Sequence, residues 1–196
     1  MLNIHTLTLG VYGTNCYIVH DSASKTCCVI DPGCSPEKIL AEVNALGLTV
    51  EAILLTHGHF DHVGGVKKIA AETGCDVYLC ADELTMPPRM TLGQLYYTKT
   101  YDEGDILHLA GLTICVIRTP GHTPGSVCLL IGDAMFSGDT LFAGSCGRTD
   151  FPGGSDAAMR ASLRRLAGLP TDYRVYPGHG MDTTLAEEKR YNPYLR

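Results

Sequence analysis

The chain has 196 residues, of which 45% are hydrophobic and 18% charged, and its formal net charge is −6. A chain of this length and apolar content can bury one hydrophobic core, so residues 1–196 are expected to form a single domain. The acidic balance excludes an extended nucleic-acid groove, which needs clustered Lys and Arg. The small number of charged residues leaves homo-oligomerisation open.

The ends of the chain and its cysteines indicate a reducing compartment. The N-terminus lacks a cationic start followed by an apolar segment, and no apolar run reaches the length of a membrane span. The nine cysteines are an odd number in a chain without an export signal, which favours free thiols. Cys75 and Cys80 have a spacing that zinc could use, but no similar pair completes a site, so we expect both to pack in the core. A cytoplasmic protein without membrane partners is predicted.

Short strands separated by turn-forming residues are expected first. They span residues 4–9, 16–20 and 26–30, and this pattern predicts an antiparallel meander. Residues 35–37 read Ser-Pro-Glu, with the serine as a candidate N-cap and the proline at the first helical position. A helix is therefore predicted over about 36–46.

A strand buried on both faces is expected next, at residues 50–55, because this run is almost continuously apolar. A helix over 64–73 and a strand over 77–80 follow. Residues 84–105 contain two adjacent prolines and two adjacent tyrosines without a clear period. Such an irregular stretch is typical of a lid or a binding loop.

The second half of the chain again alternates strands and helices. Strands are expected at residues 106–109, 112–118, 127–131, 134–137 and 173–176, with a helix at 155–166. Because no repeat or linker interrupts this alternation, it favours an α/β unit in which helices cover sheets. The order of the strands within the sheets does not follow from this pattern.

Chemistry-bearing residues gather where the buried strand ends. Residues 57–62 read His-Gly-His-Phe-Asp-His, which places four candidate ligands in six positions. Imidazole and carboxylate groups bind zinc, and also iron or manganese. A lone histidine is usually structural, but four such residues would be costly to bury without partners. The run therefore predicts a metal site.

Three later turns repeat this arrangement. Each places one candidate ligand on a glycine-containing turn after an apolar strand, and these ligands are His122, Asp139 and His179. Glycine permits turn conformations that bring a side chain to the edge of a sheet. Four unrelated turns would be the alternative, but their common form favours one shared site.

Together, residues 56–65 and the three later turns resemble the metallo-β-lactamase superfamily. The resemblance implies an αββα sandwich of two mixed sheets with outer helices, and a site at one edge of both sheets. It also implies that Asp61 and Asp139 are catalytic and that two ions, most simply zinc, are bound. The implied ligands are His57, His59 and His122 for the first ion, Asp61, His62 and His179 for the second, and Asp139 as the bridge.

This ligand set predicts a hydrolytic mechanism. Two cations about 3.5–4 Å apart can share a water whose pKa falls from about 15.7 toward 7, which yields a metal-bound hydroxide. An ester or thioester is then a natural substrate, and no side-chain nucleophile is needed. Asp61 could both bind metal and orient the hydroxide. Asp31, at the end of a strand, is a candidate hydrogen-bond acceptor for a ligand histidine, with a simple Asp-Pro-Gly turn as the alternative.

The details resemble the glyoxalase II branch, which hydrolyses thioesters such as lactoylglutathione. β-Lactam hydrolysis is not expected, because β-lactamases of this fold usually carry Arg and Cys where this chain has His62 and Asp139. Arg148 corresponds to a basic residue that holds glutathione, although it could instead be a surface residue paired with Asp150. The chain has Met181 where glyoxalase II has a tyrosine, and it lacks that enzyme's C-terminal helical domain, so it resembles the compact, single-domain glyoxalase II-like proteins.

Two other functions remain open. Persulfide dioxygenases share the fold and use one iron, which here would be held by His57, His122 and Asp139. Phe60 and the Pro-Gly-Gly sequence at 152–154 favour the hydrolase. A non-enzymatic metal-binding domain is the second alternative, but an intact set of seven ligands argues against it.

Overall fold

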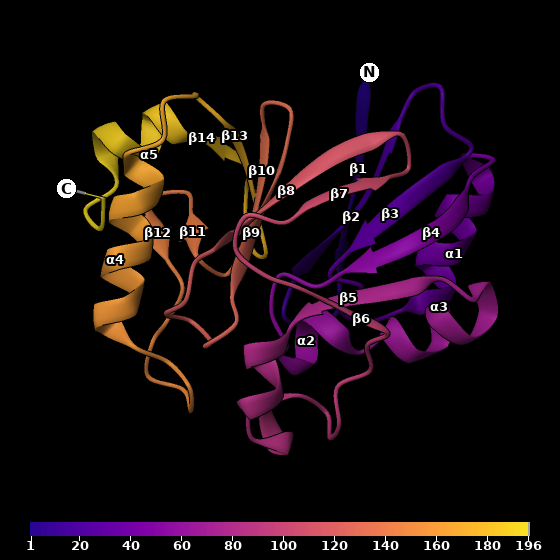
Figure 1. The fold of residues 1–196 in the computed structure, drawn as a ribbon, viewed down its shortest axis with the longest axis horizontal. Helices are drawn as coiled ribbons and strands as arrows, with labels where there is room; N and C mark the ends of the chain where they lie inside the picture. Colours follow the sequence, from indigo (N-terminus) through magenta and orange to yellow (C-terminus); the bar gives the residue numbers. More distant parts are fainter. Residues whose placement is uncertain (196) are drawn as a thin grey trace.

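The computed structural model describes residues 1–195 and contains two six-stranded sheets. The strand orders are β1-β2-β3-β4-β5-β6 and β14-β13-β10-β9-β8-β7. Figure 1 shows the sheets together in the middle of the molecule, with α1 and α3 on one outer side and α4 and α5 on the other. The αββα sandwich of two mixed sheets predicted from the sequence is confirmed.

The first sheet combines the predicted meander with parallel strands. Its strands are β1 (Leu2–Leu9), β2 (Thr14–Asp21), β3 (Thr26–Ile30), β4 (Thr49–Leu54), β5 (Asp76–Cys80) and β6 (Lys99–Tyr101). The pairs β1–β2 and β2–β3 are antiparallel, whereas β3–β4, β4–β5 and β5–β6 are parallel. The His-rich run follows β4, so it lies at the carboxyl edge of the parallel strands.

The stretch 84–105, expected to be irregular, contains strand β6, the 3₁₀ helix Pro88–Met90 and the end of the 3₁₀ helix Ala81–Thr85. In β6 only Tyr101 is buried, so the strand is too short to show a period in the sequence. Its pairing with β5 comes from tertiary packing.

The second sheet is antiparallel except at one place. Its strands are β7 (Ile106–Leu109), β8 (Leu112–Arg118), β9 (Val127–Ile131), β10 (Ala134–Gly138), β13 (Arg174–Pro177) and β14 (Thr183–Thr184). Strands β10 and β13 are parallel, so the loops after both strands emerge at the same edge. A separate ribbon of β11 (Leu141–Phe142) and β12 (Ser145–Cys146) follows β10.

The helices cover the outer faces of the sheets. They are α1 (Pro36–Ala45), α3 (Val66–Thr73), α4 (Asp156–Ala167) and α5 (Leu185–Tyr191), whereas the four-residue α2 (Phe60–Val63) lies within the His-rich run and carries Asp61 and His62. The helix predicted at 36–46 is present with Ser35 at its N-cap position, but the Ser35 side chain makes no capping hydrogen bond. Ser35 has a left-handed backbone (φ 51°, ψ 51°) rather than the extended backbone usual at an N-cap. In α4, by contrast, Ser155 accepts a hydrogen bond from the Ala158 amide.

Apolar side chains fill three layers, one between the sheets and one under each pair of outer helices. Full burial of each large side chain, such as Ile53 or Phe136, contributes about 1.5–3 kcal/mol. Cys75 and Cys80 are buried in different layers, which agrees with the packing role predicted for them. Within residues 1–195, no helix is long and apolar enough to cross a membrane.

Candidate metal centre

The candidate ligands meet at the edge shared by the two sheets. Residues 57–62 follow β4 of the first sheet, and His122 lies in the turn between β8 and β9 of the second. Asp139 follows β10 and His179 follows β13, the two strands that run parallel. Strand ends therefore bring together ligands that are more than a hundred residues apart in the chain.

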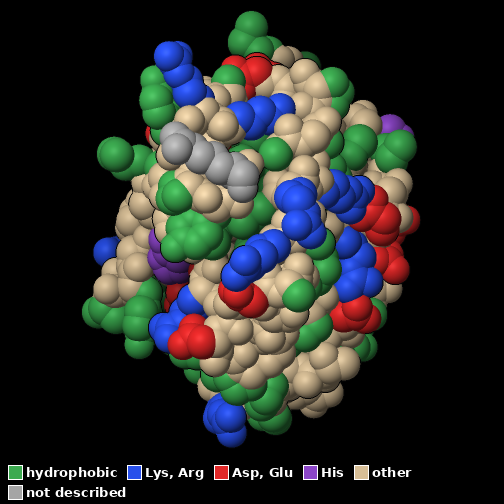
Figure 2. Space-filling model, turned by 90° about the vertical axis from the view of Figure 1, so that its left-hand side faces the viewer, with side chains coloured by type: hydrophobic (Ala, Val, Ile, Leu, Met, Phe, Trp, Pro, Cys, Tyr) green, Lys and Arg blue, Asp and Glu red, His purple; other side chains and the backbone are tan. Residues whose placement is uncertain are grey.

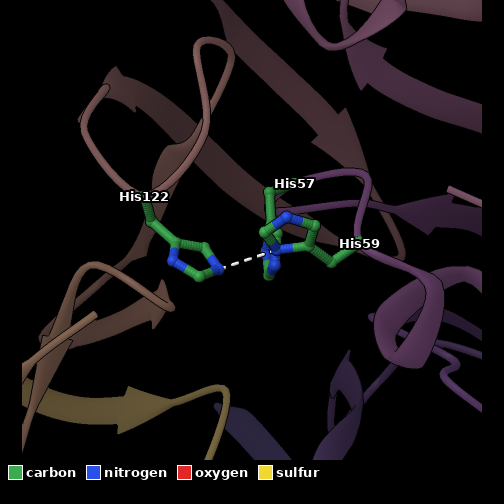
Figure 3. A group of neighbouring side chains, drawn as sticks. All are labelled: His57, His59 and His122. Atoms are coloured by element: carbon green, nitrogen blue, oxygen red, sulfur yellow. Dashed lines mark hydrogen bonds between the residues drawn. The ribbon is translucent and has the colours of Figure 1, made fainter. Parts of the chain in front are cut away.

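The first group consists of three buried histidines, His57, His59 and His122. Their candidate ligand atoms all lie within 4.8 Å of one another. His59 Nδ1 is 2.8 Å from His122 Nε2. Figure 3 shows the imidazoles of one loop facing the imidazole of the other. These are the three residues predicted for the first ion.

The second group consists of Asp61, His62 and His179, again within 4.8 Å of one another. His179 Nε2 lies 3.3 Å from Asp61 Oδ2 and 3.3 Å from His62 Nε2. These are the three residues predicted for the second ion.

Asp139 lies between the two groups. Its Oδ2 is 3.4 Å from His122 Nε2 and 3.6 Å from His179 Nε2, while its Oδ1 is 3.4 Å from His62 Nε2. One carboxylate thus contacts a histidine of the first group and two of the second, which is the geometry a bridging ligand needs.

A hydrogen-bond chain orients two of the histidines. Thr56 donates to Asp31 from its amide (2.8 Å) and its hydroxyl (2.5 Å), and His62 Nδ1 lies 3.0 Å from Asp31 Oδ2. Because the Thr56 hydroxyl donates to Asp31, it accepts from His57 Nδ1 at 3.1 Å. Protonation at Nδ1 leaves Nε2 of His57 and His62 free to bind a cation.

Backbone carbonyls orient two more histidines in the same way. His122 Nδ1 donates to the Arg148 carbonyl at 2.8 Å, and His179 Nδ1 donates to the Tyr12 carbonyl at 3.1 Å. In both, Nε2 is the nitrogen that faces the cluster.

Buried atoms without partners test whether the site fits a metal. Among residues 1–195, four buried side-chain polar atoms have no hydrogen-bond partner, and three of them are His57 Nε2, His59 Nε2 and Asp139 Oδ1. Leaving such atoms unpaired is costly. Coordination to cations would satisfy His57 Nε2 and Asp139 Oδ1, whereas His59 faces His122 with its other ring nitrogen, Nδ1. Nitrogen and carboxylate oxygen are the donors that zinc, iron and manganese accept.

The electrostatics of the cluster favour cation binding. Burial and the neighbouring His62 lower the pKa of His57, and burial together with His122 lowers the pKa of His59 to about 4, so both rings are neutral at pH 7. Burial opposes the charged form of His62, but Asp139 and Asp31 outweigh it and raise its pKa to about 9. The carboxylates thus attract a proton that a metal ion would displace.

Replacing Asp31 with alanine is expected to lower metal affinity and activity by about 10–100-fold, because His62 and Thr56 lose their shared acceptor. Bound metal and kcat/KM measure the effect. Asp133→Ala is a matched control, since Asp133 is exposed in the turn before β10, at the end of that strand opposite Asp139. Unchanged metal binding in Asp31→Ala would support the simple Asp-Pro-Gly turn.

Arg148 forms the surface ion pair with Asp150 that the sequence offered as the alternative to substrate binding. Its Nε and Nη2 donate to the two Asp150 carboxylate oxygens, both at 2.7 Å, and its guanidinium lies 3.7 Å from the centre of the Phe151 ring. It lines a hollow of about 720 Å³ that also contains Arg160 and Arg164. Figure 2 shows basic and acidic side chains mixed over this side of the molecule. Substrate binding by Arg148 stays a prediction.

If Arg148 does bind the substrate, Arg148→Ala should raise KM and leave kcat nearly unchanged, because uniform binding is removed. Steady-state kinetics test this, with Arg160→Ala as the control. Arg160 lines the same hollow and pairs with Asp156. An unchanged KM in the Arg148 variant would show that Arg148 does not bind the substrate and serves only in the ion pair with Asp150.

Several supporting residues had no signal in the sequence. Asn15 Nδ2 donates to the Pro177 carbonyl (3.0 Å) and to the Gly180 carbonyl (2.9 Å), on either side of His179. The Thr14 hydroxyl donates to Asp61 Oδ2 at 3.1 Å. Both residues belong to β2, whose apolar pattern indicated only a strand.

A sandwich of two sheets with histidine and carboxylate groups gathered at its edge defines a class of metal-binding α/β proteins. Residues 9–179 match the family model described as the metallo-beta-lactamase superfamily, and the chain belongs to this family.

Individual relatives cover almost the entire chain. Hydroxyacylglutathione hydrolase GloC of Haemophilus influenzae is 32% identical over 209 residues, which cover 99% of this chain and 98% of GloC. Among crystal structures, the B3 metallo-beta-lactamase BLEG-1 is 34% identical with a TM-score of 0.89, covering 100% of this chain and 99% of the other. TTHA1623 in a di-iron-bound form is 40% identical (TM-score 0.87; 97% and 100% covered). ETHE1 from Myxococcus xanthus is 31% identical (TM-score 0.87; 97% and 83% covered).

Proposed function

We propose that the protein is a metal-dependent thioesterase of the glyoxalase II type, acting on lactoylglutathione or a related small thioester. The observation that carries this proposal is the pair of ligand groups joined by Asp139, which offers places for two cations. The similarity to hydroxyacylglutathione hydrolase GloC over nearly the full length of both chains supports the substrate class.

The proposed reaction needs no side-chain nucleophile. A water oxygen attacks the thioester carbonyl carbon, the carbon–sulfur bond breaks, and the leaving thiolate takes up a proton. When bound, the two cations supply Lewis acidity, which lowers the pKa of water and polarises the carbonyl. The first group of histidines would hold one ion and the second group the other, with Asp139 shared.

Asp61 and Asp139 are the proposed catalytic residues: Asp61 would bind metal and orient the attacking water, and Asp139 would join the two ion sites. Burial would raise the pKa of Asp61, but its hydrogen bond with His179 and the nearby His62 hold that pKa below its usual range. The Asp61 carboxylate therefore stays ionised, and its hydrogen bond from Thr14 keeps it in one orientation.

We propose two zinc ions as the cofactor, and iron or manganese would suit the same donors. The di-iron form of TTHA1623 favours two ions and keeps iron in consideration. Because imidazole and carboxylate groups accept all three metals, cellular supply would decide between them.

A persulfide dioxygenase is the second candidate, favoured by the similarity to ETHE1, a persulfide dioxygenase. A single iron would then use His57, His122 and Asp139. Persulfide dioxygenases carry the same His-x-His-x-Asp-His run, so Phe60 and the Pro-Gly-Gly sequence at 152–154 are the features that favour the hydrolase. The exclusion of β-lactams also stays a prediction, since BLEG-1 is comparably similar.

One experiment separates these activities. The purified protein is analysed for metal and then assayed for thiol release from lactoylglutathione, oxygen uptake with glutathione persulfide, and ring opening of a chromogenic cephalosporin. We expect thiol release without oxygen uptake, lost on chelation and restored by metal. Iron-dependent oxygen uptake without thioester hydrolysis would establish the dioxygenase, and cephalosporin turnover alone would establish a β-lactamase.

A further inference from the structure

Glu83 is a buried carboxylate that does not belong to the candidate ligands. It lies in the 3₁₀ helix Ala81–Thr85, directly after β5, and its relative exposure is 0%. Its Oε2 accepts a hydrogen bond from the Gly58 amide at 2.6 Å, and its Oε1 accepts one from the Gly125 amide at 2.7 Å. Each oxygen of one carboxylate thus binds a different loop.

The two amides belong to the two loops that carry the first ligand group. Gly58 stands between His57 and His59, while Gly125 ends the turn that begins before His122. The first loop follows a strand of one sheet and the second connects two strands of the other. Glu83 therefore joins the two loops across the interface between the sheets.

Both glycines are explained by the approach of this carboxylate. A Cβ atom at Gly58 would lie 2.9 Å from Glu83 Oε2, and one at Gly125 would lie 2.8 Å from Glu83 Cγ and 2.9 Å from Oε1. Neither glycine has a positive φ. Close packing against Glu83 therefore requires the missing side chain at both positions. At Gly125 this packing, and not the turn conformation expected from the sequence, explains the glycine.

The energetic cost of burying Glu83 depends on both loops being in place. Burial raises its pKa, and hydrogen bonds from the two amides favour the ionised form. Hydrogen bonds to an ionised acceptor are roughly twice as strong as neutral ones, and a buried carboxylate that loses one pays a full desolvation penalty. A shift of either loop would break one bond, so the carboxylate fixes their separation.

We propose that Glu83 is a positioning residue that sets the distance between the His57–His59 loop and His122, and thereby the affinity of the first metal site. The second group has its own support, because Asp31 binds His62 and the Tyr12 carbonyl binds His179. This inference rests on the metal centre proposed above and not on the thioester substrate.

The test is a cobalt titration of metal-free Glu83→Gln. The glutamine amide keeps one acceptor oxygen but presents an NH₂ group to the other backbone amide, so one of the two bonds is lost. Bound Co²⁺ is measured by equilibrium dialysis and by its visible absorption, which reports the ligands of each site. We expect two ions in the native chain, and in the variant one site weakened about 10–100-fold while the other keeps its affinity and spectrum.

Glu51→Gln is the matched control. Glu51 in β4 also joins two sheets, accepting from the Thr26 hydroxyl at 2.6 Å and from the Ala110 amide at 2.9 Å, but neither partner is in a ligand loop. This variant should bind two ions as the native chain does. Gly58→Ala and Gly125→Ala, which push against the same carboxylate, should reproduce the selective weakening seen in Glu83→Gln.

Each other result overturns the proposal. Two sites of unchanged affinity in Glu83→Gln, or equal weakening of both, would show that Glu83 does not act on the first site. If the Glu83 and glycine variants fail to fold by circular dichroism while Glu51→Gln folds, Glu83 serves stability alone. A native chain that binds no cobalt, zinc, iron or manganese would refute the metal centre itself, which is a separate outcome.

Discussion

Replacing Asp139 with alanine is expected to lower turnover by about 10³-fold or more and to prevent binding of two ions together. Its carboxylate oxygens contact His122 on one side and His62 and His179 on the other, so its loss removes the link between the groups. Metal assistance contributes several kcal/mol to such reactions, and about 4 kcal/mol corresponds to about 10³-fold in rate. Metal content and kcat of the purified variant measure both effects.

Two comparison variants make this result specific. His59→Ala removes a member of the first group only, so it should abolish turnover while the second group still binds one ion. Cys75→Ser changes a buried residue in a different layer of the molecule and should leave turnover nearly unchanged. Retained activity and two bound ions in Asp139→Ala would show that the bridging role is wrong.

Replacing Gly178 with alanine is expected to cost about 10²-fold or more in kcat/KM, although glycine itself has no chemical function. A Cβ atom there would lie 2.2 Å from Asp139 Oδ1 and 2.7 Å from His62 Cε1, closer than atoms can pack. The backbone cannot easily retreat, because the Gly178 amide donates to the Gly138 carbonyl and its carbonyl accepts from the Asn15 amide, both at 2.8 Å. Displacing catalytic groups by about 1 Å can cost about 10²-fold.

Gly168→Ala is the control for this substitution. Gly168 ends α4 with a φ of −77°, and a Cβ there would meet its nearest neighbour, the Arg165 carbonyl oxygen, at 3.4 Å. Its activity and metal content should match the native chain. If Gly178→Ala also keeps both ions and full activity, the ligands can relax around a methyl group, and the site is less rigid than its packing indicates.

The fold was largely predictable because its elements have strong local patterns. The apolar run at 50–55 is the centre of the first sheet, and the meander before it has the expected antiparallel pairing. Strand β6 and the Ser35 side chain, which makes no capping hydrogen bond, show where prediction failed. A three-residue strand is too short to show an alternation of buried and exposed residues. A serine before Pro and Glu indicates where a helix begins, but it does not determine the φ angle of the serine itself.

For the site, the residue types and their spacing were sufficient to select the seven candidate ligands, because histidine and carboxylate groups on turns after buried strands have few other uses. The chemistry of a ligand belongs to the residue itself, and so the sequence determined which groups are available. The order of the strands within each sheet depended on packing between distant segments. The arrangement of the two ligand groups around Asp139 therefore depended on that packing as well.

Only the tertiary structure decided what holds those ligands in place. His179 finds its acceptor in the Tyr12 carbonyl, 167 positions away, and Glu83 reaches Gly58 and Gly125 across 25 and 42 positions. These partners are backbone groups, which every residue carries, so residue type gives no sign of them. The glycines at 58, 125 and 178 likewise resemble ordinary turn residues in the sequence. Only the structure shows that neighbouring atoms occupy the space that a side chain at each position would need.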